Sequence, residues 1–566
     1  MDFIKKEIVS IHAAAFLIGA AGFLSRLLGL FRDRLLAGEF GASRDLDIYY
    51  ASFQIPDFIF TIFLLGSATA AIIPVFLDYW ERDKDEARML VGNLFNVFLI
   101  FSAFFCVLVA VLAPFFVRLL VPGFSEEDFR VTVLMTRIMM ASPFLLSLSN
   151  IVSGVIQANR RFFVFSLSSI FYNIGIIFGI LVFLPLFGFL GLAYGVIFGA
   201  VLHMAVQLPT YFGLGFKIFP RMVDLYHPGT KRIISLSFPR VLAISFTSIS
   251  VFIVTALAST LSMGSISVMQ LANNVKYIPV GIFGVSFAVA AFPRLSSAFV
   301  KKDVSDFYGS FFGVLKTVIF WLAPVSVLFF VLRAHIIRLA LGTGLFDWRD
   351  TRLTAAVLGI FSFLIITESL LPLFIKTFYA LNKTARPLVI NLISNTVTIG
   401  LAFYFVGVFS GDGPVSRLFG GLLRISDITD IRIIGIALAV VVGQCLNFFV
   451  LLKFLMDEAR KAFGYVPQNG FLRETRFIIT VALVAGGVTY VSRQILNLFF
   501  GLDTFWGVFI QMAGAGSAGL ASYGLILYFS GNTEIQAFIE VFRRKMLKSQ
   551  VLPEEIANQQ PRDLTH

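Results

Sequence analysis

The chain has 566 residues, of which 58% are hydrophobic and 14% charged, and its formal net charge is +12. Soluble globular domains carry roughly 25% charged residues, so this composition, with a mean hydropathy of +0.88, excludes a soluble globular chain. Apolar runs of about 20 residues recur from end to end, and a helix of that length crosses a bilayer. The predicted class is an all-α integral membrane protein, because barrel strands would alternate apolar and polar residues over short segments.

The apolar runs predict about 14 transmembrane helices. Their approximate limits are 9–31, 46–78, 90–118, 131–157, 162–186, 188–213, 233–260, 266–293, 307–332, 353–381, 387–409, 432–456, 475–499 and 504–530. The second predicted span is longer than a bilayer requires and contains Pro56 and Pro74, so we expect it to be kinked or to begin in the interface. After the last span, the segment IQAFIEVFRRKMLK predicts an interfacial helix, and the remaining tail is expected to be disordered.

Lysine and arginine in the short loops predict the orientation of the chain. With the N-terminus in the cytoplasm, basic residues fall mainly on cytoplasmic segments, and the outer loops near residues 187 and 262 carry none. Two longer outer loops, 333–352 and 410–432, carry mixed charge and are exceptions. Both termini are therefore predicted to be cytoplasmic. Because the basic residues are spread over many loops, the net charge reflects topology and argues against nucleic-acid binding.

Two loose matches indicate an internal repeat. QIPDFIFTIF (54–63) recurs as YIPVGIFGVS (277–286), and QANRRFFVFSLSSIFYN (157–173) resembles YALNKTARPLVINLISN (379–395). The offsets are nearly equal, although short apolar matches also arise from composition alone. Each repeat would contain an even number of spans, so the halves would share one orientation. The predicted parts are an N-terminal lobe (1–213), a C-terminal lobe (233–456), an additional helix pair (475–530) and a cytoplasmic tail (531–566).

Charged residues gather between Ser25 and Pro74, at the end of one apolar run and the start of the next. Four residues of the first run would share one helix face, namely Gly22, Arg26, Gly29 and Asp33. Charge on a face of small residues predicts a polar cavity between helices, with Arg26 inside the run. The alternative for Arg32, Arg34 and Arg44 is that they extend to the lipid headgroups.

These residues carry a resemblance to a known family. SRLLGLFRD, then FGAS, then DxxYxxFQIP and a distal Pro-Val-Phe resemble the MurJ (MviN) family of lipid II flippases, within the multidrug/oligosaccharidyl-lipid/polysaccharide exporter superfamily. The resemblance implies about 14 helices, with two lobes of about six helices related by a parallel repeat plus a C-terminal pair. It implies a multi-pass protein of the bacterial cytoplasmic (inner) membrane. Its function would be alternating-access flipping of lipid II, a polyprenyl-pyrophosphate-linked precursor, to the outer leaflet for peptidoglycan and cell wall biogenesis.

The resemblance also implies site residues. The family's functional arginines in the first helix map to Arg26 and Arg32, the adjacent acid to Asp33, and the acid that starts the second helix to Asp47. The arginines would bind the pyrophosphate by bidentate hydrogen bonds, and the two aspartates would orient them. The residues themselves, and not the resemblance, indicate that Asn273, Asn274 and Lys276 line the second lobe, and interhelical hydrogen bonding is the alternative for the two asparagines.

Other positions depart from the family pattern. The family's arginine in the eighth helix falls on Asn274, and its polar or charged groups elsewhere fall on Phe60, Leu65 and Val254. We therefore expect an asymmetric substrate site. In that site the first-lobe arginines bind the head group, and Asn273 and Asn274 supply neutral hydrogen bonds.

Four ionisable residues within spans are candidates for coupling transport to an ion or to the membrane potential, namely Asp57, Glu368, Lys376 and Lys276. The membrane potential supplies about 2.3 kcal/mol per elementary charge per 100 mV. Lys376 lies near a cytoplasmic span end, so extension of its side chain to the interface is the alternative reading.

Other functions stay open at this stage. The same plan serves flippases of other lipid-linked glycans and exporters of amphipathic cations, and a non-transporting scaffold of envelope synthesis is a third alternative. The sequence shows no nucleophile–base set, phosphate loop or metal motif, so we expect a transporter and not an enzyme, with no cofactor or metal. The expected partners are lipid II or a related lipid, membrane lipids and cell-wall synthases.

Overall fold

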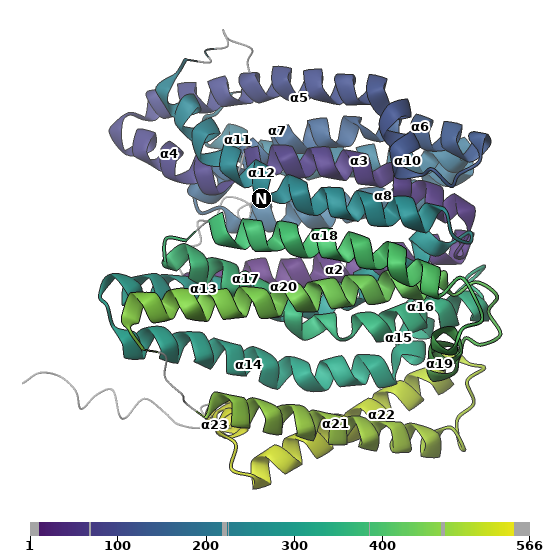
Figure 1. Cartoon of the computed structure of the whole chain (residues 1–566). Coiled ribbons are helices and arrows are strands. Elements are labelled where there is room, and N and C mark those ends of the chain that lie inside the picture. Colours follow the sequence, from purple (N-terminus) through teal and green to yellow (C-terminus); the bar gives the residue numbers. More distant parts are fainter. Residues whose placement is uncertain are drawn as a thin grey trace, which may run out of the picture.

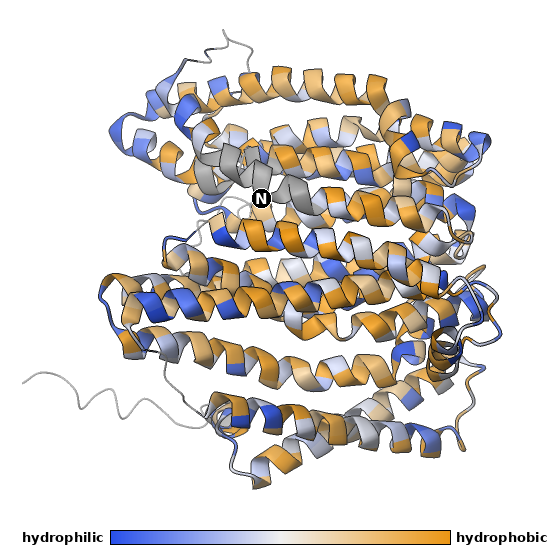
Figure 2. Cartoon of the chain, in the orientation of Figure 1, coloured by the Kyte–Doolittle hydropathy of each residue, from blue (hydrophilic) through white to orange (hydrophobic). Residues whose placement is uncertain are grey.

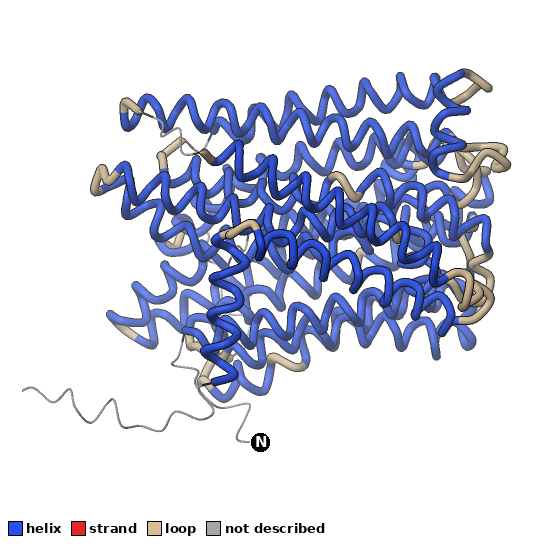
Figure 3. The backbone as a smooth tube through the Cα atoms, turned by 90° about the horizontal axis from the view of Figure 1, so that it is seen from below, coloured by secondary structure: helices blue, strands red, loops and turns tan. Residues whose placement is uncertain are grey.

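The computed structural model describes residues 11–66, 69–217, 224, 226–383, 385–465 and 470–547. These residues form helices joined by turns, with no strand among them, which confirms the all-α class. Most of the helices run along one common direction (Figure 1), and the loops gather at the two ends of the bundle (Figure 3). Polar residues concentrate at these ends and apolar residues cover the middle (Figure 2), as expected for a protein that spans a bilayer.

The first half of the chain contains α2 to α11. Their bounds are α2 (Ile11–Phe40), α3 (Arg44–Gly66), α4 (Thr69–Arg82), α5 (Lys84–Leu120), α6 (Glu126–Met139), α7 (Ala141–Ala158), α8 (Phe162–Phe178), η1 (Gly179–Phe183), α9 (Leu184–Phe187), η2 (Gly188–Leu190), α10 (Gly191–Ala205) and α11 (Leu208–Gly213). The predicted second span is divided into α3, which contains Pro56, and α4, which contains Pro74.

The second half contains α12 to α23. Their bounds are α12 (Pro228–Ser259), α13 (Ser265–Val300), α14 (Val304–Val331), α15 (Arg333–Leu341), α16 (Trp348–Phe361), α17 (Leu364–Ala380), α18 (Ala385–Val408), α19 (Pro414–Leu423), α20 (Arg432–Phe463), α21 (Phe471–Leu496), α22 (Phe505–Phe529) and α23 (Thr533–Leu547). The predicted span 353–381 is a pair of helices, α16 and α17, bent by 45°. The predicted amphipathic tail segment lies largely in α23, and the tail beyond residue 547 lies outside the described residues.

Within the described residues, nine helical segments are long and apolar enough to cross a membrane, or ten if α16 and α17 form one span. The chain is therefore a multi-pass membrane protein. The count of about 14 spans stays a prediction.

Helix packing follows a similar order in the two halves. In the first half, α8 packs between α2 and α10; in the second half, α18 packs between α12 and α20. The backbones of α8 and α10 approach so closely that a Cβ atom on Gly175 would overlap the backbone of Gly199. The halves meet where α3 packs on α12 and α13, and where α2 packs on α13. The pair α21 and α22 lies along α14, at the bottom of Figure 1.

Candidate functional site

The central polar site forms where α2 crosses α13. Asp33 on α2 accepts a hydrogen bond of 2.8 Å from the amide nitrogen of Asn274 on α13. Arg26 lies against Gly281, where any Cβ atom would overlap its guanidinium. The two contacts are seven residues apart on each helix and run in opposite directions, so α2 and α13 are antiparallel. The structure therefore brings Arg26, Asp33 and Asn274 into one interface.

Arg32 belongs to the same network. Its Nε and Nη2 atoms donate to one oxygen of Asp33, at 3.0 and 2.8 Å, while Asn274 donates to the other oxygen. Gln270 completes the chain by donating to Asn274 at 3.0 Å. The Asp33 side chain is 2% exposed and that of Arg32 is 20% exposed. Asp33 is therefore saturated and buried, whereas Arg32 keeps guanidinium surface open to a ligand.

The second face of α2 is held by α8. Asn173 on α8 donates to the Ser25 hydroxyl at 3.1 Å, and its carboxamide lies beside Gly29. Gly29 thus faces a neighbouring helix and does not line the Arg26 contact.

Arg34 donates to the backbone carbonyl of Leu339 at 2.5 Å. Its guanidinium is therefore engaged by α15.

Asp47 does not join the arginine network. One carboxylate oxygen accepts from the backbone nitrogen of Gly264 at 2.8 Å, and the other accepts from the backbone nitrogen and hydroxyl of Ser267 at 2.8 and 2.7 Å. These are groups at the N-terminus of α13, where free N–H groups attract a carboxylate. The expected role of orienting Arg26 and Arg32 is replaced by capping of α13, and Arg44 lies 3.9 Å away.

Two of the candidate coupling residues form a buried ion pair. Lys276 on α13 donates to Glu368 on α17 at 2.7 Å, and the side chains are 2% and 16% exposed. The ammonium also lies 5.2 Å from the ring centre of Phe361. This pairing engages the Lys276 ammonium with α17, which argues against Lys276 as a substitute for the arginine that Asn274 replaces.

The other two coupling candidates stand apart from this pair. Lys376 on α17 lies 5.1 Å from the ring centre of Phe292 and has no carboxylate partner among the described residues. Asp57 is an exposed residue of α3 whose carboxylate has no ion pair within the described ranges.

Asn273 lines a separate small cavity of about 180 Å³ between α3, α12, α13, α18 and α20. Its polar lining consists of neutral side chains, namely Gln54, Ser250, Thr255, Gln270, Asn273, Asn395, Thr398 and Gln444. Gln54 donates to Thr255 at 2.7 Å across the two halves. Val254 also lines this cavity.

Sequence reasoning missed several of these amides. Gln54 stands in the FQIP motif, and Gln270 lies one helical turn before Asn274, so polar residues at helical spacing were the available signal. Sequence reasoning also missed a cluster of arginines near the ends of the helices. The available signal for this cluster was the mixed charge of the two long loops 333–352 and 410–432.

Comparison with known proteins gives a consistent result. The family model described as "Lipid II flippase MurJ" matches residues 36–510. A "Probable lipid II flippase MurJ" of Buchnera aphidicola subsp. Acyrthosiphon pisum is 30% identical over 394 residues, or 68% of this chain and 76% of the relative. The "Lipid II flippase MurJ" of Burkholderia cenocepacia is 26% identical over 487 residues, or 84% of this chain and 89% of the relative.

Two solved structures share the fold. "Lipid II flippase MurJ, inward closed conformation" superposes with a TM-score of 0.71 at 22% identity and covers 91% of this chain and 99% of that chain. An inward-facing multidrug resistance transporter of the MATE family and MOP superfamily superposes with a TM-score of 0.63 at 14% identity, covering 78% and 96%.

Proposed function

Because the chain belongs to the MurJ family of lipid II flippases, whose model matches residues 36–510, we propose that it flips lipid II and binds the pyrophosphate at Arg26 and Arg32. The direction would be from the inner to the outer leaflet of the bacterial cytoplasmic membrane, in support of peptidoglycan synthesis. The head group of such a lipid is multiply charged, and moving it through hydrocarbon without a polar path is prohibitively costly.

One observation carries the assignment of the site: the Arg32–Asp33–Asn274 network links α2 of the first half to α13 of the second. An arginine keeps its charge when partly buried and offers a planar fork to phosphate oxygens. Pyrophosphate would compete with Asp33 for Arg32. Binding would thus leave Asn274 as the remaining hydrogen-bond donor to Asp33, which gives a physical link between substrate and the contact of α2 with α13.

The two halves would act as lobes of an alternating-access transporter. We assign the lobes to residues 1–213 and 233–456, with a helix pair at 475–530 and a cytoplasmic tail at 531–566. The similar packing of α2, α8 and α10 and of α12, α18 and α20 supports this division. Both termini would be cytoplasmic, and the proposed partners beyond lipids are cell-wall synthases.

Energy coupling is assigned to the pair of Lys276 and Glu368. Lys276 lies two residues after Asn274 on α13, and its pair with Glu368 is buried between α13 and α17. A change of protonation or ion occupancy at Glu368 would leave Lys276 as an uncompensated buried cation, which is costly. That cost would favour a rearrangement of α13, the helix that closes on α2.

The decisive experiment is complementation. A host depleted of its own lipid II flippase is supplied with this chain, and growth and the appearance of lipid II in the outer leaflet are measured. The proposal expects rescue by the wild type and none by Arg26→Ala at equal membrane abundance. Rescue by Arg26→Ala, or no rescue by the wild type, would contradict it.

A further inference from the structure

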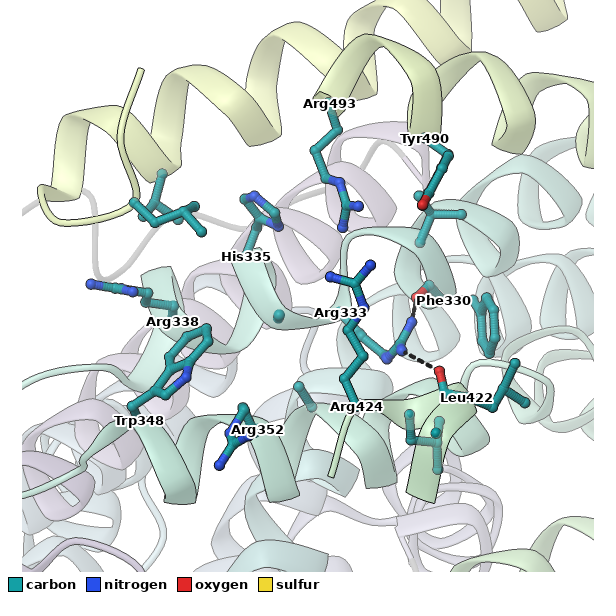
Figure 4. A pocket seen from close by; sticks show the side chains of 17 residues that line it. Phe330, Arg333, His335, Arg338, Trp348, Arg352, Leu422, Arg424, Tyr490 and Arg493 are labelled. Carbon is teal, nitrogen blue, oxygen red and sulfur yellow. Dashed lines mark hydrogen bonds between the residues drawn. The ribbon is translucent and has the colours of Figure 1, made fainter. Parts of the chain in front are cut away.

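A second basic site lies far along the chain from Arg26 and Arg32. It is a cavity of about 470 Å³ where α15, α16, the end of α19, α21 and the start of α22 meet (Figure 4). In Figure 1 these elements converge at the end of the bundle opposite α23. Under the predicted orientation this end faces the outside of the cell.

The cavity is lined by five arginines and no acidic residue. The arginines are Arg333, Arg338, Arg352, Arg424 and Arg493. Arg352 has a carboxylate partner outside the lining, because its two terminal nitrogens bind Asp427 at 2.7 and 2.5 Å. Arg338 lies 5.3 Å from the ring centre of Trp348. Even after the Asp427 pair is counted, the lining has a large excess of positive charge.

Four of these arginines have no carboxylate partner within the described part of the chain, namely Arg333, Arg338, Arg424 and Arg493. Arg333 instead donates to the backbone carbonyls of Phe330 and Leu422, at 2.8 and 3.3 Å. In Figure 4 the side chains of Arg424 and Arg493 point toward one another, with Arg333 beside them. Burial, followed by the charges of Arg424 and Arg493, lowers the pKa of Arg333 to about 10. Guanidinium groups held this close repel one another, and a bound anion would offset that repulsion.

Two further features show that the site is built. Gly359 on α16 leaves the space that the Arg333 side chain occupies, since a Cβ atom there would lie 2.7 Å from the Arg333 Cδ. His335 is 6% exposed and bonds Gln511 through Nε2 at 3.0 Å, while its Nδ1 has no hydrogen-bond partner in the described residues. His335, which lines the cavity, thus carries a buried nitrogen that the described part of the protein does not satisfy.

We propose that this cavity binds a phosphate-bearing anion through Arg333, Arg424 and Arg493. Guanidinium groups form bidentate, charge-assisted hydrogen bonds with phosphate oxygens, and three of them converge here. The cavity is larger than a single phosphate requires, and apart from His335 and Tyr490 its remaining wall is largely apolar, including Leu422 and Val508. That combination fits a phosphate carried on a lipid, and the same arginines would also bind free phosphate or pyrophosphate. The proposal is independent of flipping, because it concerns binding at residues outside the α2–α13 site.

The test measures binding to purified full-length protein at fixed ionic strength. Arg26→Gln/Arg32→Gln is used as the background so that the central arginines do not contribute. One arm titrates inorganic pyrophosphate, and the other measures binding of phosphatidylglycerol against phosphatidylcholine in mixed nanodiscs. Onto this background the double change Arg424→Gln/Arg493→Gln is introduced, which spares the backbone bonds of Arg333. The matched control is Arg417→Gln, an exposed arginine on α19 that does not line the cavity.

We expect the double change to weaken binding of at least one phosphate ligand tenfold or more, and Arg417→Gln to leave it unchanged. Loss in the nanodisc arm alone identifies a lipid headgroup, and loss in the pyrophosphate arm identifies a soluble anion. Unchanged binding in both arms would overturn the proposal. An equal loss in Arg417→Gln would overturn it as well, because the effect would then be one of net charge.

Discussion

Asn274 on α13 donates a hydrogen bond of 2.8 Å to the carboxylate of Asp33 on α2, and the same carboxylate accepts both bonds from Arg32. A helix of the second half is thereby joined to the cation that we assign to substrate binding. The relationship makes Asp33 a shared partner, so any anion that draws Arg32 away also alters the hold of α2 on α13.

Loss of either first-helix arginine is expected to stop transport. Arg26→Ala and Arg32→Ala each remove charge-assisted hydrogen bonds, which contribute roughly 1.5–3 kcal/mol apiece. The Lys variants should rescue poorly, because an ammonium lacks the planar fork. Outer-leaflet lipid II is the measurement, normalised to membrane abundance. Arg34→Ala is the matched control on the same helix: its side chain bonds the Leu339 carbonyl, so we expect it to keep flipping. Normal flipping by Arg32→Ala would contradict the assignment.

Asn274 should be less critical than the arginines, and its two variants should differ. Asn274→Ala removes one hydrogen bond to the Asp33 carboxylate, and we expect flipping to fall several-fold. Asn274→Asp places a second carboxylate against buried Asp33, and like charges repel strongly at this separation. We therefore expect the Asp variant to be the weaker of the two in the same flipping assay. Equal activity of both variants would show that the Asp33 contact is dispensable.

The sequence predicted the membrane class, the helix positions and the residue types at the centre. These features have local signals, namely apolar runs of bilayer length and the spacing of Arg26 and Asp33. The structure shows helices at the apolar runs and places Arg26 and Asp33 in one interface. What it did not predict are pairings between distant helices. Lys276 and Glu368 lie 92 residues apart, and nothing in either span selects the other as its partner. Asp47 capping of α13 likewise depends on where α3 meets the start of α13.

The arginine cavity was hidden for the same reason. Arg333, Arg424 and Arg493 come from three segments that looked individually like mixed-charge loops or a span end. Only folding brings them together without carboxylates. The broken helix at α16 and α17 was also missed, because its sequence has the hydropathy of one continuous span.

Removing one partner of the Lys276–Glu368 pair should strongly lower the stability of the protein. Lys276→Ala leaves Glu368 buried without a partner, and such losses cost about 3–5 kcal/mol. We expect low membrane abundance for Lys276→Ala, and partial recovery when Glu368→Gln is combined with Lys276→Met. Detergent-solubilised protein is compared by thermal unfolding, with flipping measured separately on the recovered fraction. If the recovered Lys276→Met/Glu368→Gln protein flips as well as the wild type, the pair is structural and the coupling proposal fails. If stable Lys276→Ala loses binding of the head group as completely as Arg26→Ala does, the asymmetric site is wrong, because loss of coupling alone would leave binding intact.

The predicted topology is open to direct labelling. Cys106 and Cys445 are first replaced by alanine, and single cysteines are introduced at exposed loop positions. Cysteines at Lys84 and Lys301 should react only after the cell is permeabilised, whereas one at Asp412 should react from outside, as basic loops face the cytoplasm. External labelling at Lys301 would reverse the orientation and place the arginine cavity on the cytoplasmic side.

Asp47 should contribute to folding stability and to the junction between the two halves. It should not contribute to binding of the charged head group. Its two oxygens accept three hydrogen bonds at the start of α13, and loss of such a cap costs about 0.5–2 kcal/mol. Asp47→Asn should not rescue Asp47→Ala, because the amide has one acceptor oxygen and its NH₂ group would face an N–H donor. We expect both variants to lower the unfolding temperature while a residual flipping activity remains.

The matched control is Asp45→Ala, an exposed aspartate in the same first turn of α3, which should leave the unfolding temperature unchanged. An exposed acid near a helix start contributes little beyond about 0.3–1 kcal/mol of dipole interaction. Complete loss of flipping in Asp47→Ala at normal thermal stability would show that this carboxylate acts on the substrate. In that case the cap seen here would belong to one conformation of the transport cycle, with Asp47 released toward the arginines in another.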